Sequence, residues 1–321
     1  MNNIFALLLI LIAHITHIPA ALAAAPDYPS KPVRIIVPFA AGAAADAVTR
    51  VVARKLTEYW GRQVILDDRP GIPGVMVAAG SAPDGYTLFM GAGSNIVTTP
   101  LTMRNPPYDP QKAFMPVGQL VNIPPILTTH PSLGAKNMKE LIALAKRRPG
   151  DLSYSSSGIG APNHLAMALL EVLAGIQMVH VPYKGAAISV TDLLSGQVQL
   201  AFNAIPSVLP LVNNGKLTAI AVSSAKRALV LPKLPTIEES VPGFQYNIWY
   251  GLFAPAGTPE ALVQKISADL QRALKERDVI DLLVAQGTEP APTTTQELAR
   301  YIQEDTARWA RIVKERNLKV D

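Results

Sequence analysis

Short apolar runs rich in β-branched residues alternate along the chain with longer segments whose apolar residues recur every three or four positions. The short runs predict strands over 33–37, 64–66, 87–90, 117–121, 152–155, 178–181, 198–202, 218–222 and 248–253. The longer segments predict helices over 44–59, 138–148, 163–173, 187–194, 259–275 and 296–315. Capping-box patterns at Asn137/Glu140 and Thr294/Glu297, and Thr258 as an N-cap before Pro259, mark three of the helix starts. This alternation is typical of α/β architecture with mostly parallel sheets.

Two extended segments interrupt the alternation and predict crossings between domains. The first, 117–130, contains Pro124-Pro125, and the second, 244–257, contains Trp249-Tyr250-Gly251. If both cross, one lobe consists of 26–127 with 246–321, and the other of 128–245. A hinge of two strands between two α/β lobes creates a cleft.

The loop 38–46 has the pattern of an anion site. A β-branched run ends at Val37, small residues follow, and a helical pattern starts near Ala44. The first backbone N–H groups of such a helix are unpaired, and the positive end of its dipole favours an anion. Neither G-x-G-x-x-G nor a P-loop is present, so nucleotide binding is poorly supported. A plain strand-to-helix turn is the alternative.

A second loop, 155–164, repeats this design in the other predicted lobe. Serines and glycines follow a strand there, and Asn163 opens an apolar helix. A surface loop without a ligand is the alternative. If both loops face one cleft, two opposed anion sites would suit a dicarboxylate. The segment 91–95, after a third strand, adds small polar residues to the same edge.

The first 25 residues have the pattern of a signal peptide. Residues 4–18 are mostly apolar, and Ala21-Leu22-Ala23 and Ala23-Ala24-Ala25 both fit a small-x-small cleavage site. The apolar run is shorter than the roughly 20 residues that a membrane span needs. The start of the chain lacks Lys and Arg, which leaves an uncleaved anchor as the alternative. We expect an exported protein, with cleavage of leader 1–25 after Ala23 or Ala25.

Composition argues against several kinds of chemistry. The chain has no cysteine, which excludes disulfides and thiolate sites. Its 29 Lys and Arg and 24 Asp and Glu give a net charge of +5, scattered without a basic run that would indicate nucleic-acid binding. Outside the leader, His130, His164 and His180 lack metal-site spacing, and no G-x-S-x-G motif occurs. We expect no cofactor, no metal and no catalytic residue.

A series of short motifs, each weak alone, occurs in a specific order along the mature chain. They are Pro38-Phe39 with Gly42 and Asp46, Arg69-Pro70-Gly71, Ala82-Pro83-Asp84-Gly85-Tyr86, Pro107-Tyr108-Asp109-Pro110, His164-Leu165-Ala166, His180-Val181-Pro182-Tyr183-Lys184-Gly185, Asp192-Leu193-Leu194-Ser195-Gly196-Gln197 and Ala254-Pro255-Ala256-Gly257-Thr258-Pro259. With them the chain resembles the Bug-type (Bordetella uptake gene) extracytoplasmic solute-binding receptors of tripartite tricarboxylate transporters.

The resemblance implies a two-lobed periplasmic-binding-protein (Venus flytrap) fold that closes over a small carboxylate. It assigns ligand contacts in the first lobe to Phe39, Ala40, Gly42, Ala43, Ala44 and Asp46, with Ser94 and Asn95 adjoining. In the second lobe it assigns them to Ser157, Gly158, Gly160 and Asn163, with Asn203 and Ser207 nearby.

Three departures from the family pattern bear on the ligand. Ala43 stands where relatives commonly have a second glycine, and Asn203 replaces a frequent aspartate. The segment 72–75 is also poorer in glycine than the usual loop. Ligand preference could therefore differ from that of any relative.

The leading hypothesis is a periplasmic receptor that presents a carboxylate ligand to the membrane components of a tripartite tricarboxylate transporter. One alternative is a receptor that signals to a membrane sensor kinase, and a remote one is a hydrolase with a dispersed triad. Di- and tricarboxylates, acidic amino acids and aromatic acids all remain open as ligands.

Overall fold

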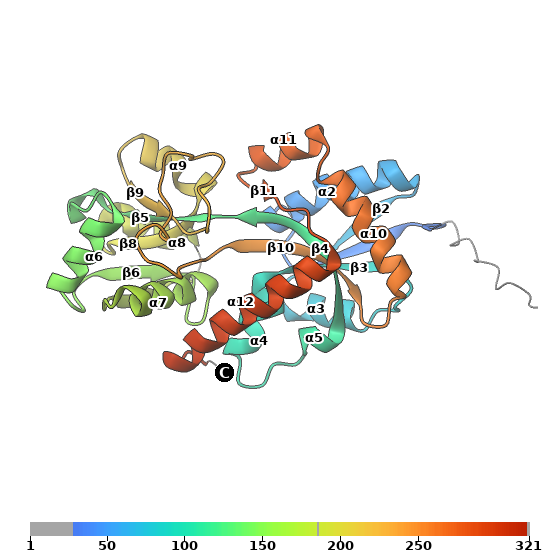
Figure 1. The fold of residues 1–321 in the computed structure, drawn as a ribbon, viewed down its shortest axis with the longest axis horizontal. Coiled ribbons are helices and arrows are strands. Elements are labelled where there is room, and N and C mark those ends of the chain that lie inside the picture. Colours follow the sequence, from blue (N-terminus) through green and yellow to red (C-terminus); the bar gives the residue numbers. More distant parts are fainter. Residues whose placement is uncertain (1–27, 185, 320–321) are drawn as a thin grey trace, which may run out of the picture.

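The computed structural model describes residues 28–184 and 186–319, which form two α/β lobes side by side (Figure 1). The first lobe holds a six-stranded sheet of order β11-β4-β10-β3-β1-β2, and the second a five-stranded sheet of order β7-β6-β8-β5-β9. The strands are β1 (Val33–Val37), β2 (Val64–Asp68), β3 (Thr87–Ala92), β4 (Phe114–Ile123), β5 (Pro125–Thr129), β6 (Ser153–Ser156), β7 (Val179–Pro182), β8 (Leu200–Ala204), β9 (Thr218–Val222), β10 (Ile248–Pro255) and β11 (Glu289–Pro290).

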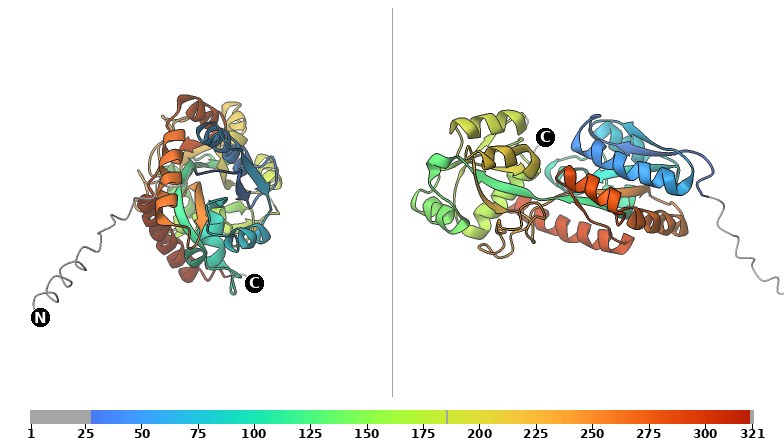
Figure 2. Two further views of the ribbon diagram at one scale, coloured as in Figure 1. Left: turned by 90° about the vertical axis from the view of Figure 1, so that its right-hand side faces the viewer. Right: turned by 90° about the horizontal axis from the view of Figure 1, so that it is seen from above.

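Helices cover the faces of both sheets (Figure 2). They are α2 (Ala44–Trp60), α3 (Ile72–Ala79), α4 (Thr99–Thr102), α5 (Pro110–Ala113), α6 (Met138–Arg147), α7 (Pro162–Ala174), α8 (Ala186–Ser195), α9 (Ile205–Asn213), α10 (Glu260–Ala273), α11 (Arg277–Ala285) and α12 (Thr295–Glu315), with a π-helix η1 (Ser94–Thr98) and a 3-10 turn η2 (Pro131–Leu133). Every strand and helix expected from the periodicity is present, with ends shifted by a few residues.

The expectation of mostly parallel sheets was wrong, because both sheets are mixed. β1 pairs in parallel with β2 and β3, and β6 does so with β7 and β8. In contrast, β10 is antiparallel to β3 and β4, and β5 is antiparallel to β8 and β9. β4, β5 and β10 belong to the crossing segments. They enter their sheets without the crossover helix that a parallel pair requires.

The chain crosses between the lobes in the two segments expected from the sequence. β4 of the first sheet and β5 of the second are separated by Pro124 alone, and the return path runs from Phe244 into β10. The lobe limits, 26–127 with 246–321 and 128–245, remain a prediction, although residues 125–127 already pair within the second sheet.

The C-terminal helix α12 extends from the first lobe to the second (Figure 1). Its apolar face contributes Leu298, Trp309 and Ile312 to a core that also contains Phe253 of the first sheet and Leu165 of α7. Near its end Arg316 pairs with the buried Glu171 of α7 at 2.7 Å (Nη2 to Oε2). Both lobes therefore rest on one helix.

Local capping explains where some helices begin. Thr294 and Glu297 form the expected capping box at the start of α12. Asn137 accepts from the Glu140 backbone N–H, but the Glu140 carboxylate reaches the Lys136 backbone N–H rather than that of the N-cap. The expected Thr258 N-cap was wrong by one residue: Pro259 holds that position.

Replacing Arg316 by Ala should lower the free energy of unfolding by about 1–3 kcal/mol. The change leaves the Glu171 carboxylate, 2% exposed, without its guanidinium partner, while the 37% exposure of Arg316 moderates the loss. Denaturant unfolding at pH 7 measures it. Arg311→Ala on the same helix breaks the exposed pair with Glu315 and should cost less than about 1 kcal/mol. Equal losses of unfolding free energy in both variants would show that the Arg316–Glu171 pair contributes no more than an exposed ion pair.

Candidate functional site

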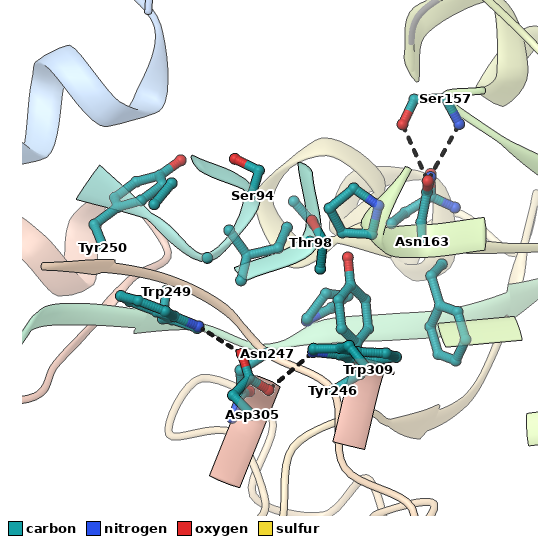
Figure 3. A pocket seen from close by; sticks show the side chains of 18 of the residues that line it. Ser94, Thr98, Ser157, Asn163, Tyr246, Asn247, Trp249, Tyr250, Asp305 and Trp309 are labelled. Carbon is teal, nitrogen blue, oxygen red and sulfur yellow. Dashed lines mark hydrogen bonds between the residues drawn. The ribbon is translucent and has the colours of Figure 1, made fainter. Parts of the chain in front are cut away.

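A cavity of about 370 Å³ lies between the lobes, where the crossing strands meet α12 (Figure 3). Its lining comes from both lobes and from the return segment. The lining residues are Phe39, Ala92, Gly93, Ser94, Thr98, Pro125, Ser157, Pro162, Asn163, Ser189, Phe202, Asn203, Ala204, Ser207, Tyr246, Asn247, Ile248, Trp249, Tyr250, Asp305 and Trp309.

Asn163 presents hydrogen-bond donors to this cavity. Its Oδ1 accepts from the backbone N–H of Ser157 at 3.2 Å and from the Ser157 hydroxyl at 3.0 Å. Because that N–H can only donate, the amide oxygen of Asn163 must face Ser157. The Asn163 NH₂ group is thereby directed elsewhere and is available to a carboxylate.

Asn203 has the opposite orientation. Its Nδ2 donates to the Thr128 hydroxyl oxygen at 2.8 Å, and that hydroxyl in turn donates to the Ala201 carbonyl at 3.2 Å. Since the single hydroxyl hydrogen is already used, Thr128 must accept from Asn203. The Asn203 Oδ1 is therefore left as an acceptor without a hydrogen-bond partner among the described residues.

Three hydroxyls on the cavity wall add further donors. Within the part of the chain that the structure describes, the hydroxyls of Ser94, Tyr246 and Tyr250 have no hydrogen-bond partner. Burial raises the pKa of Tyr250 to about 12, and burial also raises the pKa of Tyr246. Both phenols stay protonated at neutral pH and can donate.

Asp305 is the one charged side chain among the described lining residues, and its charge is already compensated. Its Oδ1 accepts from Trp309 Nε1 at 2.9 Å and from Arg308 Nη1 at 3.0 Å, and its Oδ2 accepts from Trp249 Nε1 at 3.1 Å. Burial raises the pKa of Asp305, while these donors oppose the shift. The carboxylate acts as an anchor for two indole rings of the wall.

Gly93 allows one of these rings to approach the backbone. A Cβ atom at Gly93 would lie 2.6 Å from Trp249 Nε1, closer than any side chain permits. The backbone of Gly93 is in the ordinary helical region, which any residue can adopt. Glycine is therefore required here because a side chain would clash with Trp249, and not because of the backbone conformation.

The structure brings together part of the ligand-binding set expected from the sequence. Phe39, Ser94, Ser157, Asn163, Asn203 and Ser207 line the cavity. The remaining residues, Ala40, Gly42, Ala43, Ala44, Asp46, Asn95, Gly158 and Gly160, are not part of its wall, and a ligand contact for them stays a prediction.

The first loop is partly occupied by its own acid. Ala43 caps α2 without a side-chain hydrogen bond, which leaves first-turn N–H groups open as expected. However, Asp46 Oδ2 accepts from the Gly42 N–H at 2.8 Å, and Asp46 Oδ1 lies 2.8 Å from Arg50 Nε. An anion at this loop would compete with the Asp46 carboxylate.

The second loop is held by two stacked imidazoles. The rings of His164 and His180 lie 3.7 Å apart, nearly parallel. His164 Nδ1 accepts from the Gly160 N–H at 3.0 Å, and His180 Nε2 lies 2.6 Å from the Ser156 hydroxyl. His164 ends the loop, and His180 lies beside it in space. Both histidines hold the loop in place, and neither lines the cavity.

Sequence reasoning did not name Thr98, Phe202, Tyr246, Asn247, Asp305 or Trp309 as site residues, and it placed Trp249 and Tyr250 in a crossing segment without assigning them to the site. One sequence signal could have identified Asp305. It lies on the apolar stripe of α12 that includes Ile302 and Trp309, and a carboxylate on such a stripe indicates a buried partner.

Among the described residues no cluster of His, Cys, Asp and Glu could hold a metal ion. No described helix is long and apolar enough to cross a membrane.

Two sheets joined by crossing strands around such a cavity define the periplasmic-binding-protein fold. Residues 48–318 match the family model of the tripartite tricarboxylate transporter family receptor, TctC. BugT of Bordetella pertussis strain Tohama I is 33% identical over 306 residues, covering 94% of each chain. The chain therefore belongs to the TctC receptor family and is a solute-binding protein, not an enzyme.

Related structures with bound ligands share the fold over most of their length. R. palustris Rpa4515 with adipate is 33% identical with a TM-score of 0.75, over 89% of this chain and 97% of that one. MatC from Rhodopseudomonas palustris with bound malate is 30% identical with a TM-score of 0.71, over 89% and 100%. A further relative is the periplasmic binding protein BugD, at 32% identity and a TM-score of 0.71, over 91% and 99%.

Acidification should destabilise the fold through His164. Burial first, and then the nearby His180 and Arg316, lower the pKa of His164 from 6.5 to about 4. Between these values the unfolded chain binds more protons than the folded one, so stability is lost as pH falls from 6.5 to 4. The loss from this group is on the order of 3 kcal/mol. Denaturant unfolding at pH 7, 6, 5 and 4.5 follows it.

His164→Asn is the matched control for that experiment. Its amide oxygen can still accept from the Gly160 N–H, but it does not titrate. The variant should show a flatter pH dependence than the parent, since only the His164 contribution is removed. Identical slopes would show that His164 does not carry the effect.

Proposed function

We propose that this protein is a periplasmic receptor that captures a small carboxylate in the cavity between its lobes. One observation carries the proposal: the cavity wall offers neutral donors, above all the NH₂ group of Asn163, which is not used by Ser157. The described lining residues include no Lys, Arg or His. Neutral amides and hydroxyls bind a carboxylate without the desolvation of a buried cation. The adipate and malate bound by relatives fit the same ligand class.

Location and partners complete the proposal. The chain would be exported by its leader, 1–25, which lies outside the described residues. Its lobes, 26–127 with 246–321 and 128–245, would close on the ligand, because groups from both lobes line the cavity. The closed form would then be presented to the membrane components of a tripartite tricarboxylate transporter, the system for which the family is named.

A thermal-shift screen over a panel of carboxylic acids tests the proposal. At least one acid should raise the melting temperature in proportion to the logarithm of its concentration. The bound compound should be recovered chemically unchanged. A panel without any stabilising acid would contradict carboxylate binding.

Asn163→Asp should weaken binding of the stabilising acid by at least about tenfold, because it replaces donors by a like charge. Titration calorimetry measures the change. Asn105→Asp, on an exposed loop outside the cavity, adds the same charge and should leave affinity within twofold. Equal affinity in both variants would remove Asn163 from the site.

A further inference from the structure

We infer that the ligand is an aromatic carboxylate, a planar ring that carries one or two carboxylate groups; this rests on the proposed function and narrows it. The cavity wall contains two groups of aromatic rings and several neutral polar groups. Its lining holds no cationic side chain among the described residues. The rings bear on the body of the ligand, and the polar groups and the lack of a cation bear on its charge.

The first aromatic wall comes from the first lobe. Phe39 follows β1, and its ring lies 6.2 Å from that of Tyr250 on β10. The second wall surrounds the return segment: the Tyr246 ring lies 5.7 Å from Phe202 and 6.0 Å from Trp309, both nearly edge-on. Figure 3 shows Tyr250 and Tyr246 separated across the cavity.

These rings are held rigidly. Tyr246, Phe202 and Trp309 are 3%, 4% and 3% exposed, so their packing leaves them little freedom to move when a ligand enters. The Asp305 hydrogen bonds fix the planes of Trp249 and Trp309. A preorganised aromatic wall favours a flat aromatic body, because offset or edge-on ring contacts add affinity beyond the burial of apolar area.

The polar groups fit a carboxylate attached to that body. Ser94 and Thr98 of η1 and Ser157 and Asn163 of the second lobe lie on one side of the cavity in Figure 3. Their groups are neutral, so they suit a ligand of low charge. A small tricarboxylate would bring several charges into an apolar enclosure without a counter-ion, which is costly.

The lone charge in the wall does not indicate a cationic ligand instead. Both carboxylate oxygens of Asp305 are already hydrogen-bonded, and Arg308 lies 3.0 Å from Oδ1. An ammonium ligand would therefore gain little from this carboxylate.

Matched probes separate aromaticity from shape and charge. We would titrate benzoate against cyclohexanecarboxylate, and terephthalate against trans-cyclohexane-1,4-dicarboxylate, with adipate, malate and citrate alongside. At least one aromatic acid should bind about 3- to 10-fold more tightly than its saturated partner, and citrate should bind most weakly. Equal or tighter binding of the saturated acids would overturn the inference.

The outcomes distinguish this inference from the proposed function. If adipate or malate binds and both aromatic acids fail, the carboxylate receptor stands and the aromatic assignment is wrong. If no acid in the panel binds, the proposed function fails with it.

Tryptophan fluorescence locates the ligand. Trp249 and Trp309 line the cavity, whereas Trp60 lies at the end of α2 with its Nε1 bonded to Asp269. A Trp60→Phe variant should keep the full fluorescence response to the aromatic acid. Loss of the response in this variant would place the ligand elsewhere.

Phe39→Leu tests the ring contact. It keeps an apolar side chain on a half-buried position, and it should weaken binding of the aromatic acid about 2- to 10-fold. Binding of the saturated partner should stay within twofold. Equal weakening of both acids would show that Phe39 contributes area alone and would contradict a ring-specific contact.

Discussion

The buried carboxylate of Asp305 joins the C-terminal helix to the crossing strand at the cavity wall. It accepts hydrogen bonds from Trp249 on the crossing strand β10 and from Trp309 one turn further along α12. A buried carboxylate is costly unless it is paired, and Arg308 supplies the pairing. These bonds hold α12, which contacts both lobes, against β10, which joins them. They also place the indole rings of Trp249 and Trp309 in the cavity wall.

The aromatic residues of the cavity wall contact both lobes. The Tyr246 ring packs on Phe202 of β8 and on Trp309 of α12, and the Tyr250 ring packs on Phe39, which follows β1. The donors are divided between the lobes as well, with Ser94 in the first and Asn163 in the second. A movement of one lobe relative to the other would therefore change the spacing of both the donors and the rings.

Local patterns were sufficient to predict the elements and part of the site. The loop that contains Ser157 and Asn163 was found because it follows a strand end, and the resemblance then assigned these two residues to the ligand. The crossing segment was found because it is extended and contains Pro124-Pro125. Helices α3, α9 and α11 were not predicted from the pattern; α3 and α9 contain Pro73 and Pro206 at first-turn positions, which tolerate proline. The Trp249–Asp305 contact spans 56 residues, and nothing local encodes it. The contact of the Asp46 carboxylate with the Gly42 N–H, in contrast, spans only four residues, and the pattern analysis overlooked it.

The absence of a cationic side chain from the described cavity wall is itself consistent with a receptor that must release its ligand. A Lys or Arg buried against the ligand would be left uncompensated on release, and that penalty would oppose opening. Hydroxyl and amide groups exchange a carboxylate for water at smaller cost, because each can donate equally to a water molecule. Affinity then has to come from enclosure and from contact with the rings. The aromatic wall and the neutral donors both fit the proposed reversible capture of a carboxylate.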